Sequence, residues 1–60
     1  MVLKTISKWH KITAEKDGNF YIVFDSVKSV FGGGWDNQEL KRGLSLSQIK
    51  ELKQFLDLTK

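Results

Sequence analysis

Aromatic and basic side chains alternate near the start of the chain, in the segment Lys8-Trp9-His10-Lys11. If this segment is a strand, Trp9 and Lys11 lie on the same face, because side chains alternate between the two faces of a strand. An indole can stack on a nucleic-acid base while a neighbouring ammonium group contacts the phosphate. The segment therefore has the chemistry of a single-strand binding surface. The alternative is structural, since a small domain also needs aromatic residues for its core.

Two further positions carry the same types of side chain. Tyr21 lies in an apolar segment, and Trp35 follows three consecutive glycines that would allow a bend or a close approach of another backbone. Trp35 could instead cover the edge of the core. The pair Lys41-Arg42 precedes Gly43 and reads either as a phosphate clamp or as a solvated turn.

Signatures of catalysis and of metal binding are scarce. The glycine run Gly32–Gly34 leads into Trp35 rather than into the Gly-Lys-Ser/Thr of a phosphate-binding loop. The carboxylates are scattered, the chain has no cysteine, and His10 is its only histidine. A zinc site needs several such ligands. We therefore expect a non-enzymatic protein with no cofactor, no metal and no small-molecule substrate.

The charge is modestly positive and unevenly distributed. The formal net charge is +3. Residues 1–16 carry four lysines and one glutamate, residues 17–40 one lysine and four carboxylates, and residues 41–60 five cations and two carboxylates. If the two basic segments share a face, that face suits a polyanion. Ordinary solubilising surface charge is the alternative reading.

The elements that would position these side chains follow from the hydrophobic pattern. Loose alternation predicts strands over residues 2–13, 19–25, 27–35 and 39–46 of a single domain spanning residues 1–60. Asp17-Gly18 predicts a hairpin turn. Apolar residues at helical spacing predict an amphipathic helix over residues 48–58, with Ser47 as its N-cap. The expected fold class is α+β, with four antiparallel strands followed by one helix.

The sequence also suggests which surfaces are buried. Phe20, Ile22 and Phe24 form a wholly apolar strand face, which we expect in the core. A domain of this size buries a small core, and such chains often gain stability from disulfides, metals or a second subunit. Without cysteines or metal ligands, a homodimer is the remaining route. No apolar run approaches the roughly 20 residues of a membrane-spanning helix, so we expect no membrane partner and an intracellular, cytoplasmic or nucleoid-associated location, in the host cytoplasm if the protein is phage-encoded.

The last third of the chain resembles the positive-cofactor-four family of transcriptional coactivators, which has short bacterial and phage relatives. The resemblance lies in the run from Lys41 to Ser47 (KRGLSLS) leading into the helix segment QIKELKQFL, and in the upstream Trp35 with its polar turn. It covers about residues 35–56, and elsewhere it is one of strand order. The absence of an aromatic residue at the first hairpin tip and the triple glycine depart from the family pattern.

The resemblance implies a curved four-stranded antiparallel sheet with a C-terminal helix, paired as a homodimer that binds single-stranded DNA or melted duplex with little sequence preference. By position, Trp35 would stack on a base, Lys41 and Arg42 would contact the backbone, and Lys16 would lie in a contacting hairpin. Together with the residue patterns above, this gives one set of predicted nucleic-acid contacts, Trp9, Lys11, Lys16, Tyr21, Lys28, Trp35, Lys41 and Arg42, and one predicted dimer interface, Ile49, Leu52, Phe55 and Leu56.

Three functions follow as hypotheses, and the third, a structural subunit of a larger assembly, has no sequence feature of its own in its favour. The first is a single-stranded DNA binding homodimer that acts in replication, recombination or transcription, with RNA as a further possible ligand. The second is a small protein-interaction module, such as a phage-encoded inhibitor of a host enzyme.

Overall fold

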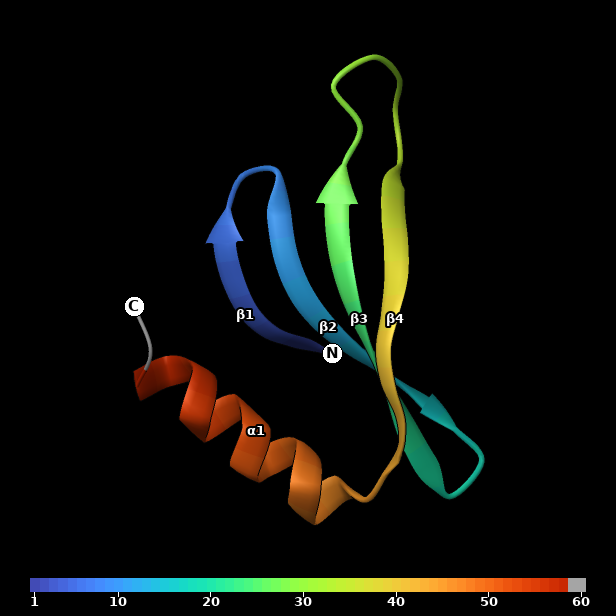
Figure 1. Cartoon of the computed structure of the whole chain (residues 1–60), viewed down its shortest axis with the longest axis vertical. Coiled ribbons are helices and arrows are strands. Elements are labelled where there is room, and N and C mark those ends of the chain that lie inside the picture. The colour runs from blue at the N-terminus through green and yellow to red at the C-terminus, as the bar shows by residue number, and fades with distance from the viewer. Residues whose placement is uncertain (59–60) are drawn as a thin grey trace.

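A computed structural model describes residues 1–58 of the chain. Its elements are β1 (Val2–Ser7), β2 (His10–Asp17), β3 (Phe20–Lys28), β4 (Trp35–Leu44) and α1 (Leu46–Leu58). The strands form one antiparallel sheet in the order β1-β2-β3-β4, and α1 follows the last strand (Figure 1). The expected α+β fold with a four-stranded antiparallel sheet and one C-terminal helix is therefore confirmed.

The strand boundaries differ from the prediction. The predicted strand over residues 2–13 is wrong, because the chain reverses at Lys8-Trp9 and forms two strands. No Gly, Pro or Asn marks this turn. Instead, the Ser7 hydroxyl accepts a hydrogen bond from the backbone N–H of Trp9 at 3.1 Å and closes the turn with a side chain.

The predicted division between residues 19–25 and 27–35 is also wrong. Strand β3 continues through Ser26 to Lys28, and a loop of residues 29–34 precedes β4, which begins at Trp35 rather than at residue 39. Ser26 is the polar residue between the two predicted strands. It fits inside the sheet because its hydroxyl bonds to side chains on both neighbouring strands.

Two glycines shape the ends of the sheet. Gly18 and Asn19 connect β2 to β3, and Gly18 has a φ of 64° whereas no non-glycine residue in the described range has a positive φ. This is the pattern of a type II′ hairpin turn, which needs glycine at its first central position. Gly43, with a φ of 77°, lies at one of two irregularities in the β3–β4 register. Such bulges bend a strand.

The helix begins two residues earlier than predicted, and its cap is Ser45 rather than Ser47. The Ser45 hydroxyl accepts from the backbone N–H of Gln48 at 3.3 Å, and the Gln48 side chain accepts from the N–H of Ser45 at 2.8 Å. This reciprocal arrangement is a capping box. At the other end, the Lys4 ammonium donates to the carbonyl of Leu56 at 2.7 Å, where a cation complements the helix dipole.

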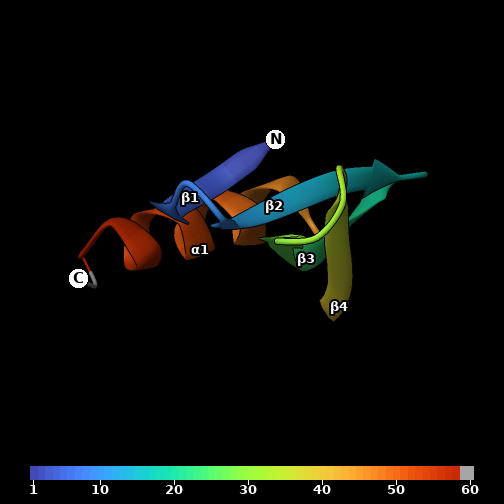
Figure 2. The same cartoon turned by 90° about the horizontal axis from the view of Figure 1, so that it is seen from above.

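The core lies between the sheet and α1, which contacts β1, β3 and β4 (Figure 2). It consists of five buried apolar residues, Leu3, Ala14, Val23, Leu44 and Ile49. Four partly buried residues pack around this core: Ile12, Tyr21, Leu52 and Leu56. The prediction that Phe20, Ile22 and Phe24 form the core is wrong. Their side chains alternate with Val23, which faces the helix, and Phe20 is 53% exposed.

The molecule is flat, and it is open for its mass. Its extents are 36 × 28 × 14 Å, and it exposes 4686 Å² of surface. A compact monomer of this mass exposes about 4,000 Å². One helix covers part of one sheet face, and the other face, called here the open face, has no covering element within residues 1–58.

Candidate nucleic-acid interface

The sheet register gathers two predicted aromatic residues at one end of the open face. Lys28 is opposite Trp35 on β4, and its backbone N–H donates to the carbonyl of Trp9 at 2.7 Å on the other side. Trp9, Lys28 and Trp35 thus form a row across three neighbouring chain segments. Lys11, two residues along from Trp9, has its side chain on the same face.

Each indole in this row has an ammonium group over its ring. The Nζ atom of Lys11 lies 4.4 Å from the ring centroid of Trp35, and that of Lys28 lies 5.3 Å from the ring centroid of Trp9. Both distances are those of cation–π contacts. The two indoles remain accessible, at 50% exposure for Trp9 and 37% for Trp35. The face therefore presents two solvent-accessible rings, each with a positive charge within reach.

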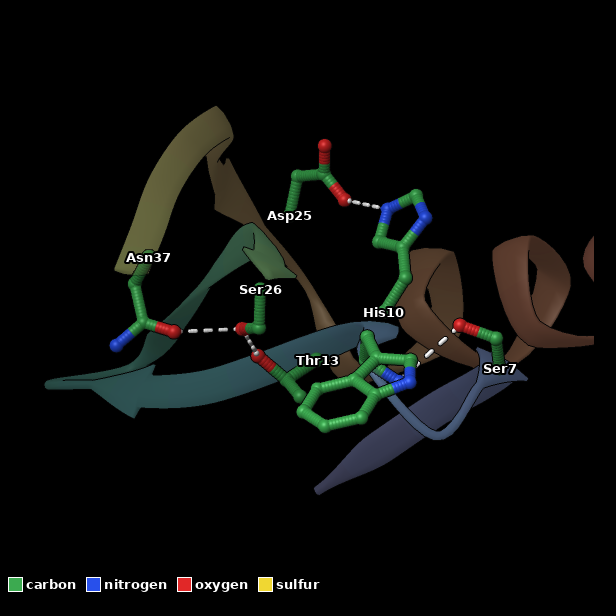
Figure 3. A network of polar contacts seen from close by, with 7 residues as sticks. Ser7, His10, Thr13, Asp25, Ser26 and Asn37 are labelled. Carbon is green, nitrogen blue, oxygen red and sulfur yellow. Dashed lines mark hydrogen bonds and ion pairs between the residues drawn. The ribbon is translucent and has the colours of Figure 1, made fainter. Parts of the chain in front are cut away.

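A row of polar side chains lies next to the indoles, and the sequence reasoning missed it. The hydroxyls of Thr13 and Ser26 are 3.3 Å apart, and the Ser26 hydroxyl donates to Oδ1 of Asn37 at 2.6 Å (Figure 3). Together with Lys11 and Trp35 they line a shallow groove of about 290 Å³. The Asn37 amide nitrogen supplies a donor that could read a base edge. The sequence shows these polar residues at alternating positions within three separate strands. Only the pairing of the strands places them side by side as a row.

Arg42 also lies on the open face, but toward the far end of the sheet, opposite Ile22. Its guanidinium forms an ion pair with Glu39, in which Nε donates to Oε1 at 3.0 Å. The hydrogen bond and the charge of Arg42 lower the pKa of the Glu39 carboxyl, and Glu39 in turn raises the pKa of Arg42. Arg42 is therefore already engaged by a carboxylate, seven residues along the strand from Trp35.

The remaining three predicted contacts lie on the helix side of the sheet. Lys41 is opposite Val23 and lines a groove beside the helix. Lys41 and Arg42 therefore lie on opposite faces of the sheet and cannot form the predicted phosphate clamp together. Lys16 is opposite Tyr21, and Tyr21 packs against the core. The structure thus groups Trp9, Lys11, Lys28 and Trp35, and separates Lys16, Tyr21 and Lys41 from them.

The predicted dimer residues have different environments. Ile49 is 1% exposed in the core, so its side chain is not available at the surface where the sequence analysis placed it. Leu52 and Leu56 are half-buried and line an apolar groove of about 360 Å³ together with Leu40 and Leu44. Phe55 is 64% exposed on the helix surface.

His10 forms a half-buried side-chain hydrogen bond with Asp25 on the helix side of the sheet (Figure 3). This pair explains how the only histidine is accommodated between strands β2 and β3. Within residues 1–58 no group of three or more potential ligands is placed to hold a metal ion.

Comparison of the chain with protein-family models, with curated proteins and with solved structures gives no match. No helix in the described part of the chain is long and apolar enough to cross a membrane.

Proposed function

We propose that this protein binds single-stranded nucleic acid, DNA in the first place, on the open face of its sheet. The observation that carries the proposal is the pair of accessible indoles, Trp9 and Trp35, each with a lysine ammonium over its ring. Bases would stack on the rings, and Lys11 and Lys28 would neutralise the adjoining phosphates.

The energies favour an exchange of partners on binding. An exposed cation–π contact is worth about 0.5–1 kcal/mol, whereas a stacked base contributes about 1–3 kcal/mol. The lysine side chain is flexible, so its ammonium can leave the ring for a phosphate when a base takes its place. Each lysine then keeps an electrostatic partner, and each ring gains a larger apolar contact.

Low sequence specificity fits the chemistry of this face. Stacking tolerates every base, because all bases have a flat π surface. Few groups on the face could read base edges, and the amide of Asn37 is the clearest of them. We place the function in replication, recombination or transcription inside the cell, where single strands arise.

We further propose that the protein acts as a homodimer paired through its helix side. The apolar groove at Leu40, Leu44, Leu52 and Leu56, with Phe55 exposed nearby, is the surface that a second copy would cover. The excess of exposed area over that of a compact monomer supports this proposal. Pairing there leaves the open face of each subunit accessible.

The test is a titration of the protein with a labelled single strand and with its duplex at two salt concentrations, with tryptophan emission followed in parallel. Preferential, salt-sensitive binding of the single strand with quenching of the indoles is expected. No binding at low salt, where electrostatic attraction is strongest, would refute the proposal. Light scattering during size-exclusion chromatography measures the mass independently, and a monomer would refute the dimer alone.

The apolar groove also favours a second candidate, a protein-interaction module such as an inhibitor that docks on an enzyme. It predicts a monomer with an accessible groove and no affinity for nucleic acid. The same two measurements therefore separate the candidates.

A further inference from the structure

The loop between β3 and β4 carries an apolar tip that the sheet does not cover. Phe31 is 100% exposed and Val30 is 79% exposed. Figure 1 shows this loop extending beyond the β1–β2 turn at the same end of the sheet. Phe31 therefore gains nothing from burial in the folded chain, although burying a phenylalanine would be worth about 1.5–3 kcal/mol.

The backbone holds the loop at a defined place and leaves its tip unconstrained. Lys28 pairs with Trp35 at its base, and the N–H of Ser29 donates to the carbonyl of Gly34 at 3.1 Å. A Cβ atom at Gly32 or Gly33 would meet nothing within 4 Å, so these glycines are not required by packing. A glycine run next to Phe31 lets the ring change its direction.

The loop continues the row of indoles. Lys28, the residue before the loop, has its ammonium over the ring of Trp9, and the last glycine of the loop is followed directly by Trp35. Residues 29–34 contain no charged side chain. A ring in this position has no ammonium of its own to meet a phosphate, in contrast to the two indoles. Its chemistry suits a flat apolar surface rather than a strand with a charged backbone.

We propose that Phe31 stacks on the last base pair of a duplex where its strands separate, while a released strand lies along Trp9 and Trp35. The terminal base pair is the flat apolar surface that such a ring fits, and proteins use apolar side chains as wedges at base steps in this way. The ligand would then be a junction of single- and double-stranded nucleic acid. This inference rests on the proposed single-strand function.

The experiment compares two probes on the full chain, a single strand and a hairpin duplex with a single-stranded tail of the same sequence. The hairpin carries 2-aminopurine in the base pair next to the tail. The variants are Phe31→Ala and the matched control Phe20→Ala, which removes another exposed phenylalanine at the opposite end of β3. Because Phe31 is fully exposed, its replacement leaves the melting temperature unchanged.

For Phe31→Ala, the preference for the tailed hairpin over the single strand is expected to fall by about 5- to 140-fold, the range for one lost stacking contact. The change in 2-aminopurine fluorescence that accompanies binding of the tailed hairpin should also become smaller. Affinity for the single strand should stay the same, and Phe20→Ala should behave as the wild type on both probes.

An equal loss on both probes would overturn the inference, because Phe31 would then be a general strand contact. No loss on either probe would also overturn it and would leave the loop tip as a surface for a protein partner. If the wild type binds the single strand but shows no preference for the tailed hairpin, only this inference fails. If the wild type binds neither probe, the proposed function itself fails.

Discussion

Replacing Lys11 and Lys28 together by alanine tests the open face through its charges. If each ammonium neutralises one phosphate, the double variant releases two fewer counterions on binding. For single strands the slope of log K against log salt changes by about 0.7 per phosphate, so the slope should become shallower by about 1.4. If the wild type and the double variant bind equally at 1 M salt, this slope difference makes the double variant roughly 25-fold weaker at 0.1 M salt.

The matched control is Lys16→Ala with Lys41→Ala. It also removes two positive charges from a protein of net charge +3, but it removes them from the helix side of the sheet. Its slope should stay close to that of the wild type, because these lysines lie away from the bound strand. The control also tests the positions that the family resemblance implies, since Lys41 and Lys16 are contacts in that reading.

The assay is fluorescence anisotropy of a labelled single strand at four or more salt concentrations. Thermal denaturation runs beside it, because the double variant also loses two cation–π contacts worth about 0.5–1 kcal/mol each. Equal flattening in both double variants would show that net charge rather than the open face governs binding. Flattening in the control alone would place the strand on the helix side and refute the assignment of the face.

Three further predictions concern the scaffold. Ser45→Ala should lower the free energy of unfolding by about 1 kcal/mol through loss of the cap, which is roughly 4–8 °C in melting temperature, and Ser47→Ala should change it far less in the same denaturation experiment. Ile49→Val should cost about 0.5–1.5 kcal/mol, because it removes one buried methylene, and a loss near zero in urea titration would contradict the described core. The folded-state pKa of Glu39 lies below its ordinary value of 4.5. The stabilisation by Arg42 is therefore complete above pH 4.5 and is lost as the pH falls through the lowered pKa of the folded state. An NMR titration in which Arg42→Gln leaves the Glu39 pKa unchanged would contradict the ion pair.

The local pattern was enough to predict the fold class, the Asp17-Gly18 turn and the C-terminal helix, but it divided the first three strands wrongly. Alternating β-branched and aromatic residues indicate strands, Asp17-Gly18 indicates a tight turn, and the spacing of apolar residues after Ser47 indicates a helix. These signals are local because each depends on the backbone geometry of a few neighbouring residues. The same local reading named Trp9 and Lys11 as a pair on one strand face; their side chains do share the open face, but Trp9 lies in the turn before β2 rather than on the strand.

The local pattern could not tell which face of the sheet the helix covers. Both faces of β3 carry large apolar side chains, so a period of two residues separates Val23 from Ile22 and Phe24 without saying which side is buried. The short connection through Leu44 and Ser45, after the positive φ of Gly43, places α1 on the side of Val23. Long-range packing therefore decided the core, because the two faces differ little in hydrophobicity.

The tertiary structure also decided which candidate residues form a site. Lys41 and Arg42 are neighbours on a strand and therefore lie on different faces, and the register shift in β4 between Glu39 and Lys41 decides that Arg42 is the one on the open face. The β2–β3–β4 register joins Thr13, Ser26 and Asn37 and brings Lys28 beside both indoles. Residue types along the sequence determine which chemistry is available. Their grouping depends on the pairing of strands, which is set by contacts between residues distant in the chain.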